Sequence, residues 1–215
     1  NVTVASLKNL ATKHFHFPLY ALPSEFVNRF TNQLPVFMLN NFVGSGAVGI
    51  YNLATRMLAL PIQFVGESIS TVFQQKAVHD YNLIGNCRTI FVKTFRTLAL
   101  ISVIPVIVIL LLGPNLFAFI FGQEWREAGI YAQLMLALIT GKLVVSPLTY
   151  LYFIASKQRE SFYLHIWMLL SSLSIFYFGF SNKLPTYTVL LIFSLNYATI
   201  YIIYLIRSYK FSQNI

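Results

Sequence analysis

Uncharged, apolar stretches long enough to cross a bilayer follow one another along almost the whole chain. Thr97 to Gln123 and Phe30 to Thr55 hold no charged residue, and a transmembrane helix needs about 20 such residues. Turn signals at Gly44 to Gly46 and at Gly113-Pro114 separate neighbouring stretches. The pattern predicts an all-α integral membrane protein, with a cytoplasmic connector over residues 1–25 and a six-helix bundle over residues 26–215. The predicted spans are about 26–43, 48–73, 91–113, 129–155, 161–180 and 187–206.

The second predicted span, within Ile50 to Phe73, carries polar residues at regular intervals. At ~100° per residue, one helix face collects Asn52, Arg56, Gln63 and Glu67, and the opposite face is aliphatic. A charged group near the bilayer centre costs about 2.5 to 3.5 kcal/mol on insertion scales. This polar face therefore requires a partner helix or a water-filled cavity.

Two further spans carry shorter polar faces. In the fourth span Lys142 shares a helical face with Ser146 and Thr149, and in the first span Gln33 and Asn40 share a face. We expect these side chains to line a cavity with the polar face of the second span. The alternatives are an interhelical ion pair for Lys142, and hydrogen bonds to neighbouring helices for the two amides.

The composition supports the membrane assignment and excludes most catalytic classes. The chain has 215 residues, of which 57% are hydrophobic and 10% are charged, whereas a soluble domain has about a quarter charged residues. The single cysteine excludes an intramolecular disulfide and a site with several cysteine ligands. No nucleophile–base set, paired carboxylates or phosphate-binding glycine loop stands out. We therefore expect no catalytic residues, no metal site, no cofactor and no enzymatic activity.

The first residue is Asn1 and no signal peptide follows, which suggests a fragment of a longer chain.

The net charge of +9 follows from the topology and not from nucleic-acid binding. With six spans, eleven Lys and Arg residues fall on one side of the membrane and two, Arg126 and Lys183, on the other. The positive-inside rule then places both termini of this segment in the cytoplasm. The eleven are Lys8, Lys13, Arg29, Lys76, Arg88, Lys93, Arg96, Lys157, Arg159, Arg207 and Lys210.

Two stretches resemble a known transporter family. Phe17 to Ala77, which contains the run LPVFMLNNFVGSGAVGIYNLATRMLALPIQFVGESIS, is similar to the C-terminal half of Wzx-type lipid-linked oligosaccharide flippases. Phe121 to Met135, FGQEWREAGIYAQLM, resembles a stretch that opens a helix in the same family. These flippases belong to the multidrug/oligosaccharidyl-lipid/polysaccharide exporter superfamily, whose members have two helical bundles around a central cavity.

The resemblance implies a bacterial inner-membrane protein that moves an undecaprenyl-diphosphate-linked repeat unit of O-antigen or capsule to the outer leaflet. Its partners would be the lipid-linked oligosaccharide, membrane lipids and other proteins of polysaccharide assembly. The chain would supply one bundle of a two-bundle transporter. A doubly anionic, hydroxyl-rich headgroup cannot enter hydrocarbon without polar partners, so a cavity with fixed cations would meet the requirement.

Alternatives remain at both the residue level and the functional level. Arg56 suits a diphosphate, or it snorkels to the outer interface. Glu67 could couple transport to a proton or sodium gradient, or it could be a counter-ion of Lys142. A small-molecule or multidrug exporter of the same superfamily would favour acidic cavity residues. A membrane enzyme of polysaccharide assembly would carry its chemistry on a large external loop, and the predicted external loops are short.

Overall fold

The computed structural model describes the backbone of residues 16–213 and the side chains of residues 22–60 and 64–213. All regular structure in this range is helical. The long helices are α2 (His16–Phe42), α3 (Ser45–Pro61), α4 (Glu67–Ile84), α5 (Arg88–Phe121), α9 (Gln158–Ser181) and α10 (Thr186–Phe211). The shorter elements are the π-helix η1 (Ile62–Gly66), the 3-10 helices η2 (Gln123–Trp125) and η3 (Ser146–Tyr150), α6 (Arg126–Leu134), α7 (Leu136–Val145) and α8 (Leu151–Ile154).

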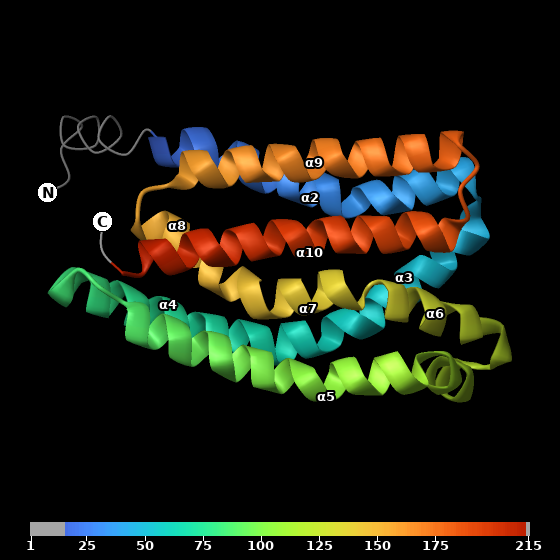
Figure 1. Cartoon of the computed structure of the whole chain (residues 1–215), viewed down its shortest axis with the longest axis horizontal. Helices are drawn as coiled ribbons and strands as arrows, with labels where there is room; N and C mark the ends of the chain where they lie inside the picture. Colours follow the sequence, from blue (N-terminus) through green and yellow to red (C-terminus); the bar gives the residue numbers. More distant parts are fainter. Residues whose placement is uncertain (1–15, 214–215) are drawn as a thin grey trace, which may run out of the picture.

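The helices lie lengthwise in an elongated bundle (Figure 1). We call the end at which α2 begins and α10 ends the proximal end, and the opposite end the distal end. From the proximal end α2 runs to the distal end, α3, η1 and α4 return, and α5 runs out again. The segment α6 to α8 returns, α9 runs out and α10 comes back. The predicted spans overlap these passes in the same order, although α2 begins at His16, inside the predicted connector.

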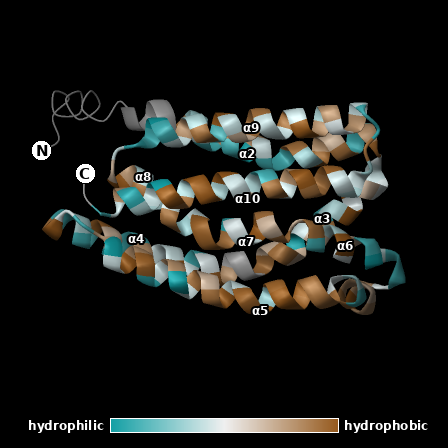
Figure 2. Cartoon of the chain, viewed as in Figure 1, coloured by the Kyte–Doolittle hydropathy of each residue, from teal (hydrophilic) through white to brown (hydrophobic). Residues whose placement is uncertain are grey.

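Five segments are long and apolar enough to cross a membrane, namely Ser45–Ile84, Arg88–Phe121, Leu136–Ile154, Gln158–Ser181 and Thr186–Phe211. The helix α2 is not among them, because asparagines and other polar residues dilute its apolar character. It nevertheless packs along α9 and runs in the same direction (Figure 1). Hydrophobic residues follow α5, and hydrophilic residues gather at both ends of the bundle (Figure 2). This is the surface expected of a multi-pass membrane protein.

Two irregularities in the helical hydrogen bonding have clear causes in the sequence. Pro61 lacks the N–H that an α-helix requires at that position, and the chain continues as the π-helical turn η1 before α4. In α5, Pro114 leaves the carbonyl of Leu110 without its usual helical partner. Gln133 of α6 donates a 2.8 Å hydrogen bond to that carbonyl. The same region brings Gly113 and Gly129 into contact, so α5 and α6 pack backbone to backbone.

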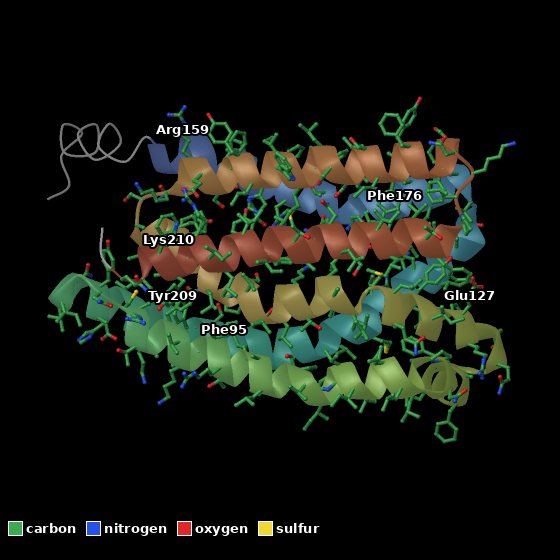
Figure 3. All side chains as sticks on the ribbon, in the orientation of Figure 1. Phe95, Glu127, Arg159, Phe176, Tyr209 and Lys210 are labelled. Carbon is green, nitrogen blue, oxygen red and sulfur yellow. The ribbon has the colours of Figure 1, made fainter. Side chains whose placement is uncertain are left out.

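Charged residues mark the two ends of the bundle. Arg159 and Lys210 lie at the proximal end and Glu127 at the distal end (Figure 3). An ion pair between Arg207 and Glu160 joins α10 to α9 at the proximal end. At the distal end the hydroxyl of Tyr187 donates a 2.7 Å hydrogen bond to Glu127. Polar contacts thus close both ends of the bundle, and apolar packing fills the length between them.

Candidate functional site

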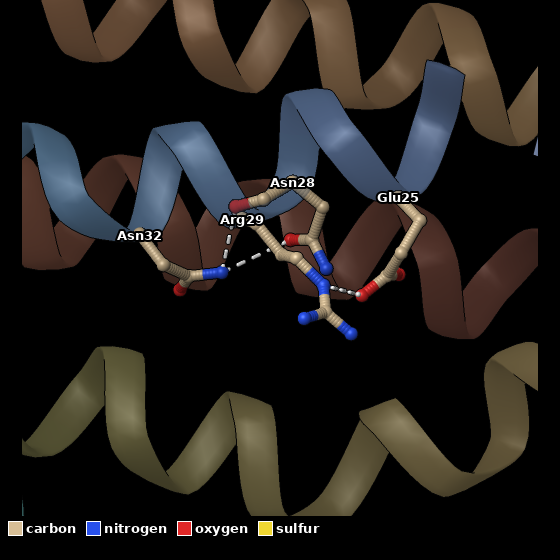
Figure 4. A network of polar contacts seen from close by, with 4 residues as sticks. All are labelled: Glu25, Asn28, Arg29 and Asn32. Atoms are coloured by element: carbon tan, nitrogen blue, oxygen red, sulfur yellow. Dashed lines mark hydrogen bonds and ion pairs between the residues drawn. The ribbon is translucent and has the colours of Figure 1, made fainter. Parts of the chain in front are cut away.

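One face of α2 carries a continuous row of polar side chains. Arg29 Nε lies 2.9 Å from Glu25 Oε1, and Asn32 Nδ2 donates to the backbone carbonyl of Asn28 at 2.8 Å. All four point away from the α2 axis on the same side (Figure 4). The intervals of three and four residues place them one above another on the helix. Because both partners of the Arg29–Glu25 pair are exposed, this row faces open space.

The first cavity, which we call the central cavity, has a volume of about 430 Å³. It lies between α2, α3, the start of α4, the α6–α7 segment and α10. Aromatic and aliphatic side chains, including Tyr51, Phe193 and Tyr197, form part of its wall. Its polar wall consists of Asn32, Gln33, Asn52, Thr55, Arg56, Glu67 and Lys142. Charged side chains from three helices, α3, α4 and α7, therefore line the same cavity.

The second cavity, which we call the end cavity, has a volume of about 410 Å³ and lies closer to the proximal end. Its wall includes the first turns of α9, the last half of α10 and the η3–α8 segment. The aromatic residues Tyr152, Phe153, Tyr201 and Tyr204 line it. Its polar lining residues include Ser24, Glu25, Asn28, Ser146, Thr149 and His165.

The two cavities share a wall. Asn32 and Lys142 line both of them. Along α2 the lining residues extend from Leu22 to Val36, which corresponds to about 21 Å at 1.5 Å per residue. The result is a polar track along α2 that leads from the proximal end toward the middle of the bundle.

Packing around α7 fixes the position of Lys142. The helix is interrupted at Met135, between α6 and α7. Ser194 Oγ of α10 accepts a 3.1 Å hydrogen bond from the backbone N–H of Leu138. Gly141 lets α7 approach α10 closely, since a Cβ at that position would lie 2.9 Å from Cδ2 of Tyr201. Lys142 therefore projects from α7, and the adjacent face of α7 packs against α10.

The charged groups of the central cavity are not neutralised in pairs. Among the residues whose side chains are described, Arg56, Glu67 and Lys142 take part in no ion pair. The ion-pair alternative for Lys142 thus finds no partner in this part of the chain. Two cations face one carboxylate across the cavity, which leaves a formal excess of one positive charge.

The residues predicted from the sequence fall into five groups. The central cavity brings together Gln33, Asn52, Arg56 and Glu67, the end cavity holds Ser146 and Thr149, and Lys142 lies in both. Asn40 lies outside both cavities, beyond their distal limit on α2. The side chain of Gln63 lies outside the described side chains. The assignment of these residues to substrate binding stays a prediction.

Several lining residues lie outside the polar faces predicted from the sequence. Asn28 and Asn32 follow the same three- and four-residue spacing as Glu25 and Arg29, and this spacing was the signal that could have identified them. His165 was harder to recognise, since its contact with Ser24, at 2.7 Å between Nδ1 and Oγ, spans 141 residues. Within the described part of the chain no three His, Cys, Asp or Glu residues lie close enough to hold a metal ion.

Comparison with known proteins gives a consistent result. A family described as "Polysaccharide biosynthesis protein" matches residues 3–130. The chain is 28% identical over 115 residues to "Teichuronic acid biosynthesis protein TuaB" of Bacillus subtilis (strain 168). That match covers 53% of this chain and 24% of the relative, so the chain aligns with about a quarter of the relative's length. No solved structure matches the chain.

Proposed function

The chain belongs to the polysaccharide biosynthesis protein family, and we propose that it takes part in moving a lipid-linked oligosaccharide across the bacterial inner membrane. The observation that carries this proposal is the track formed by the central and end cavities inside a bundle of membrane-spanning helices. An anionic, hydroxyl-rich headgroup needs polar partners at every depth of the hydrocarbon, and the track supplies such partners over about 21 Å.

The charge balance of the central cavity favours an anionic substrate group. Arg56 and Lys142 outnumber Glu67, and a planar guanidinium matches the oxygens of a diphosphate. An exporter of organic cations, the alternative within the superfamily, would be better served by an excess of carboxylates. We therefore assign the central cavity to the undecaprenyl diphosphate linkage of an O-antigen, capsule or related repeat unit.

An apolar groove on the other side of α7 supports a lipid-linked substrate. This groove has a volume of about 180 Å³ and is lined by residues such as Met57, Pro105 and Leu143 of α3, α5 and α7. Ile139 lines both this groove and the central cavity. A polyprenyl chain could thus remain in an apolar setting while its headgroup occupies the track.

The exposed polar face formed by α2, α3 and the start of α4 supports a two-bundle arrangement. Gln33, Arg56 and Glu67 line the central cavity and are nevertheless exposed. At membrane depth an uncovered charge costs about 2.5 to 3.5 kcal/mol on insertion scales, so we propose that a second helical bundle covers this face.

We further propose that the proximal end faces the cytoplasm, because Lys and Arg are concentrated there.

Substitution of the cavity cations tests the proposed function. In the complete protein, we expect Arg56→Ala and Lys142→Ala to abolish surface polysaccharide and to leave lipid-linked repeat units in the inner leaflet. Arg126→Ala and Lys210→Ala serve as matched controls, since both residues are exposed and lie outside both cavities. Surface polysaccharide is measured on gels, and membrane insertion is checked by immunoblot. Normal polysaccharide in both cavity variants would contradict the assignment.

A further inference from the structure

We propose that the end cavity is a saccharide-binding subsite, which holds the sugar residues of the lipid-linked substrate while the central cavity holds the diphosphate. This inference rests on the proposed function and adds a division of the track into two chemically different compartments. It also identifies the residues that would recognise the sugar.

The charge of the end cavity differs from that of the central cavity. Among the described residues that line it, Lys142 at the shared wall is the only Lys or Arg. The carboxylate of Glu25 also lines it and is paired with Arg29. The remaining polar groups are amides, hydroxyls and the imidazole of His165. Such groups donate and accept hydrogen bonds, which suits a polyhydroxylated ligand better than a phosphate.

Aromatic rings supply the second element of sugar recognition. Tyr201 and Tyr204 of α10 and Tyr152 of α8 line the same cavity as the polar residues of α2. A pyranose has apolar C–H faces and polar edges, and tyrosine likewise combines an apolar ring with a polar tip. A pocket that combines aromatic walls with a few convergent polar groups is the usual form of a small-molecule site, and its volume lies within the roughly 300 to 1,000 Å³ of such sites.

Two tyrosines of the aromatic wall pack against each other. Tyr152 Oη is buried and has no hydrogen-bond partner among the described residues. Leaving a buried polar group unpaired is unfavourable, and most such groups in native proteins are paired. The neighbouring Tyr204, whose ring packs edge-to-face on Tyr152 with centroids 5.4 Å apart, donates instead to the carbonyl of Ser161. Tyr152 therefore contributes its ring, and not its hydroxyl, to the wall of the end cavity.

The order of the two cavities fits the covalent structure of the substrate. Sugar and diphosphate are directly linked, and the cavities meet at Asn32 and Lys142. The end cavity lies toward the proximal end, from which the headgroup would enter in the proposed orientation.

The inference is tested with two probes on the complete protein in lipid nanodiscs. One is undecaprenyl diphosphate, and the other is the lipid-linked oligosaccharide extracted from the cells that produce the protein. We expect the wild type to bind the glycosylated probe at least about tenfold more tightly, which corresponds to about 1.4 kcal/mol. Asn28→Ala and Tyr201→Leu should reduce this preference at least about fivefold, as expected for the loss of one or two sugar contacts, without weakening undecaprenyl diphosphate binding.

Matched controls separate the possible outcomes. Asn41→Ala and Tyr177→Leu replace an exposed asparagine of α2 and an exposed tyrosine of α9 outside the end cavity, and they should retain the full preference. If Tyr201→Leu does not fold, Tyr201→Phe keeps the ring and should still lower the preference about twofold or more. A wild type without preference, or cavity variants that retain it, would overturn the subsite. Failure of the wild type to bind either probe would instead reject the proposed function.

Discussion

The contact between α5 and α6 makes a quantitative prediction, because it depends on the absence of a side chain at Gly129. A Cβ on Gly129 would lie 2.5 Å from Cα of Pro114 and closer still to the carbonyl oxygen of Gly113. Both are backbone atoms and cannot rotate away, so the helices must separate. Overpacking of this kind costs about 1 to 3 kcal/mol.

Two further contributions change that value in opposite directions. Separation of the helices weakens the 2.8 Å hydrogen bond from Gln133 to the carbonyl of Leu110, which is worth about 0.5 to 1.5 kcal/mol. Alanine is favoured over glycine within a helix by about 1 kcal/mol. We therefore expect Gly129→Ala to lower the free energy of unfolding by roughly 1 to 3 kcal/mol.

The single cysteine provides the assay. Cys87 is buried, and burial together with the nearby Asp80 carboxylate raises the pKa of its thiol to about 11. The native protein should therefore react slowly with a fluorogenic maleimide at neutral pH, and the dye should report unfolding. A change of 1 kcal/mol shifts the melting temperature by about 2 to 4 °C in a chain of this size.

A second glycine is the matched control. Gly49 also lies inside a helix, α3, but a Cβ there would meet nothing within 4 Å. Gly49→Ala should therefore raise the free energy of unfolding by about 0.5 to 1 kcal/mol. A melting temperature of Gly129→Ala at or above that of the wild type would refute the close packing. Equal losses in both variants would show that the contact is not the cause.

Other expectations concern a buried hydroxyl and the membrane orientation. Tyr152→Phe removes an unpartnered hydroxyl and should leave the protein as stable as the wild type or up to about 1 to 3 kcal/mol more stable. Tyr204→Phe loses a hydrogen bond and should lower the free energy of unfolding by about 0.5 to 1.5 kcal/mol. A larger loss for Tyr152→Phe in the same melting assay would be inconsistent with its unpaired state. In a Cys87→Ala background, an impermeant maleimide should label Lys183→Cys on intact cells and Lys210→Cys only after permeabilisation. The reverse pattern would invert the proposed orientation.

Much of the fold could be predicted from apolar runs and turn residues. Length and composition alone define helices that can cross a bilayer, and Gly44 lies where the chain reverses between α2 and α3. The turn predicted at Gly113-Pro114 was wrong, because α5 continues through both residues to Phe121. The ends of the helices were less predictable. The length of a membrane span is set by the thickness of the membrane, whereas a helix continues as long as its backbone hydrogen bonds do. The helix containing the second predicted span continues to Ile84, and α2 begins at His16, both well beyond the apolar stretches.

The candidate site shows where periodicity succeeds and where it fails. Arg56 and Glu67 lie eleven residues apart and line the same cavity, even though the π-helical turn η1 lies between them. Asn40 shares a face with Gln33 and yet lies beyond the distal limit of the cavity. The angle between two residues around a helix does not indicate how far a cavity extends along the helix axis. The tertiary contacts between distant helices decide that limit.

Packing between distant segments was the part that the sequence could not reveal. Ser146 and Thr149 were expected on a regular helical face with Lys142, but Pro147 lies within the 3-10 helix η3. All three still line the end cavity. Its aromatic wall comes from α8 and α10, which are far from α2 in sequence, so only the folded chain shows that these rings face Asn28 and Glu25.

The central claim is that the cations of the central cavity assist the passage of an anionic, sugar-bearing lipid headgroup. The most direct test measures movement of a lipid-linked oligosaccharide between the leaflets of vesicles that contain the complete protein, with an impermeant glycosidase to score the exposed sugar. We predict that the wild type makes the inner-leaflet pool accessible, and that the Arg56→Ala, Lys142→Ala double variant leaves it protected as in protein-free vesicles. Equal accessibility with the wild type and the double variant would contradict the account.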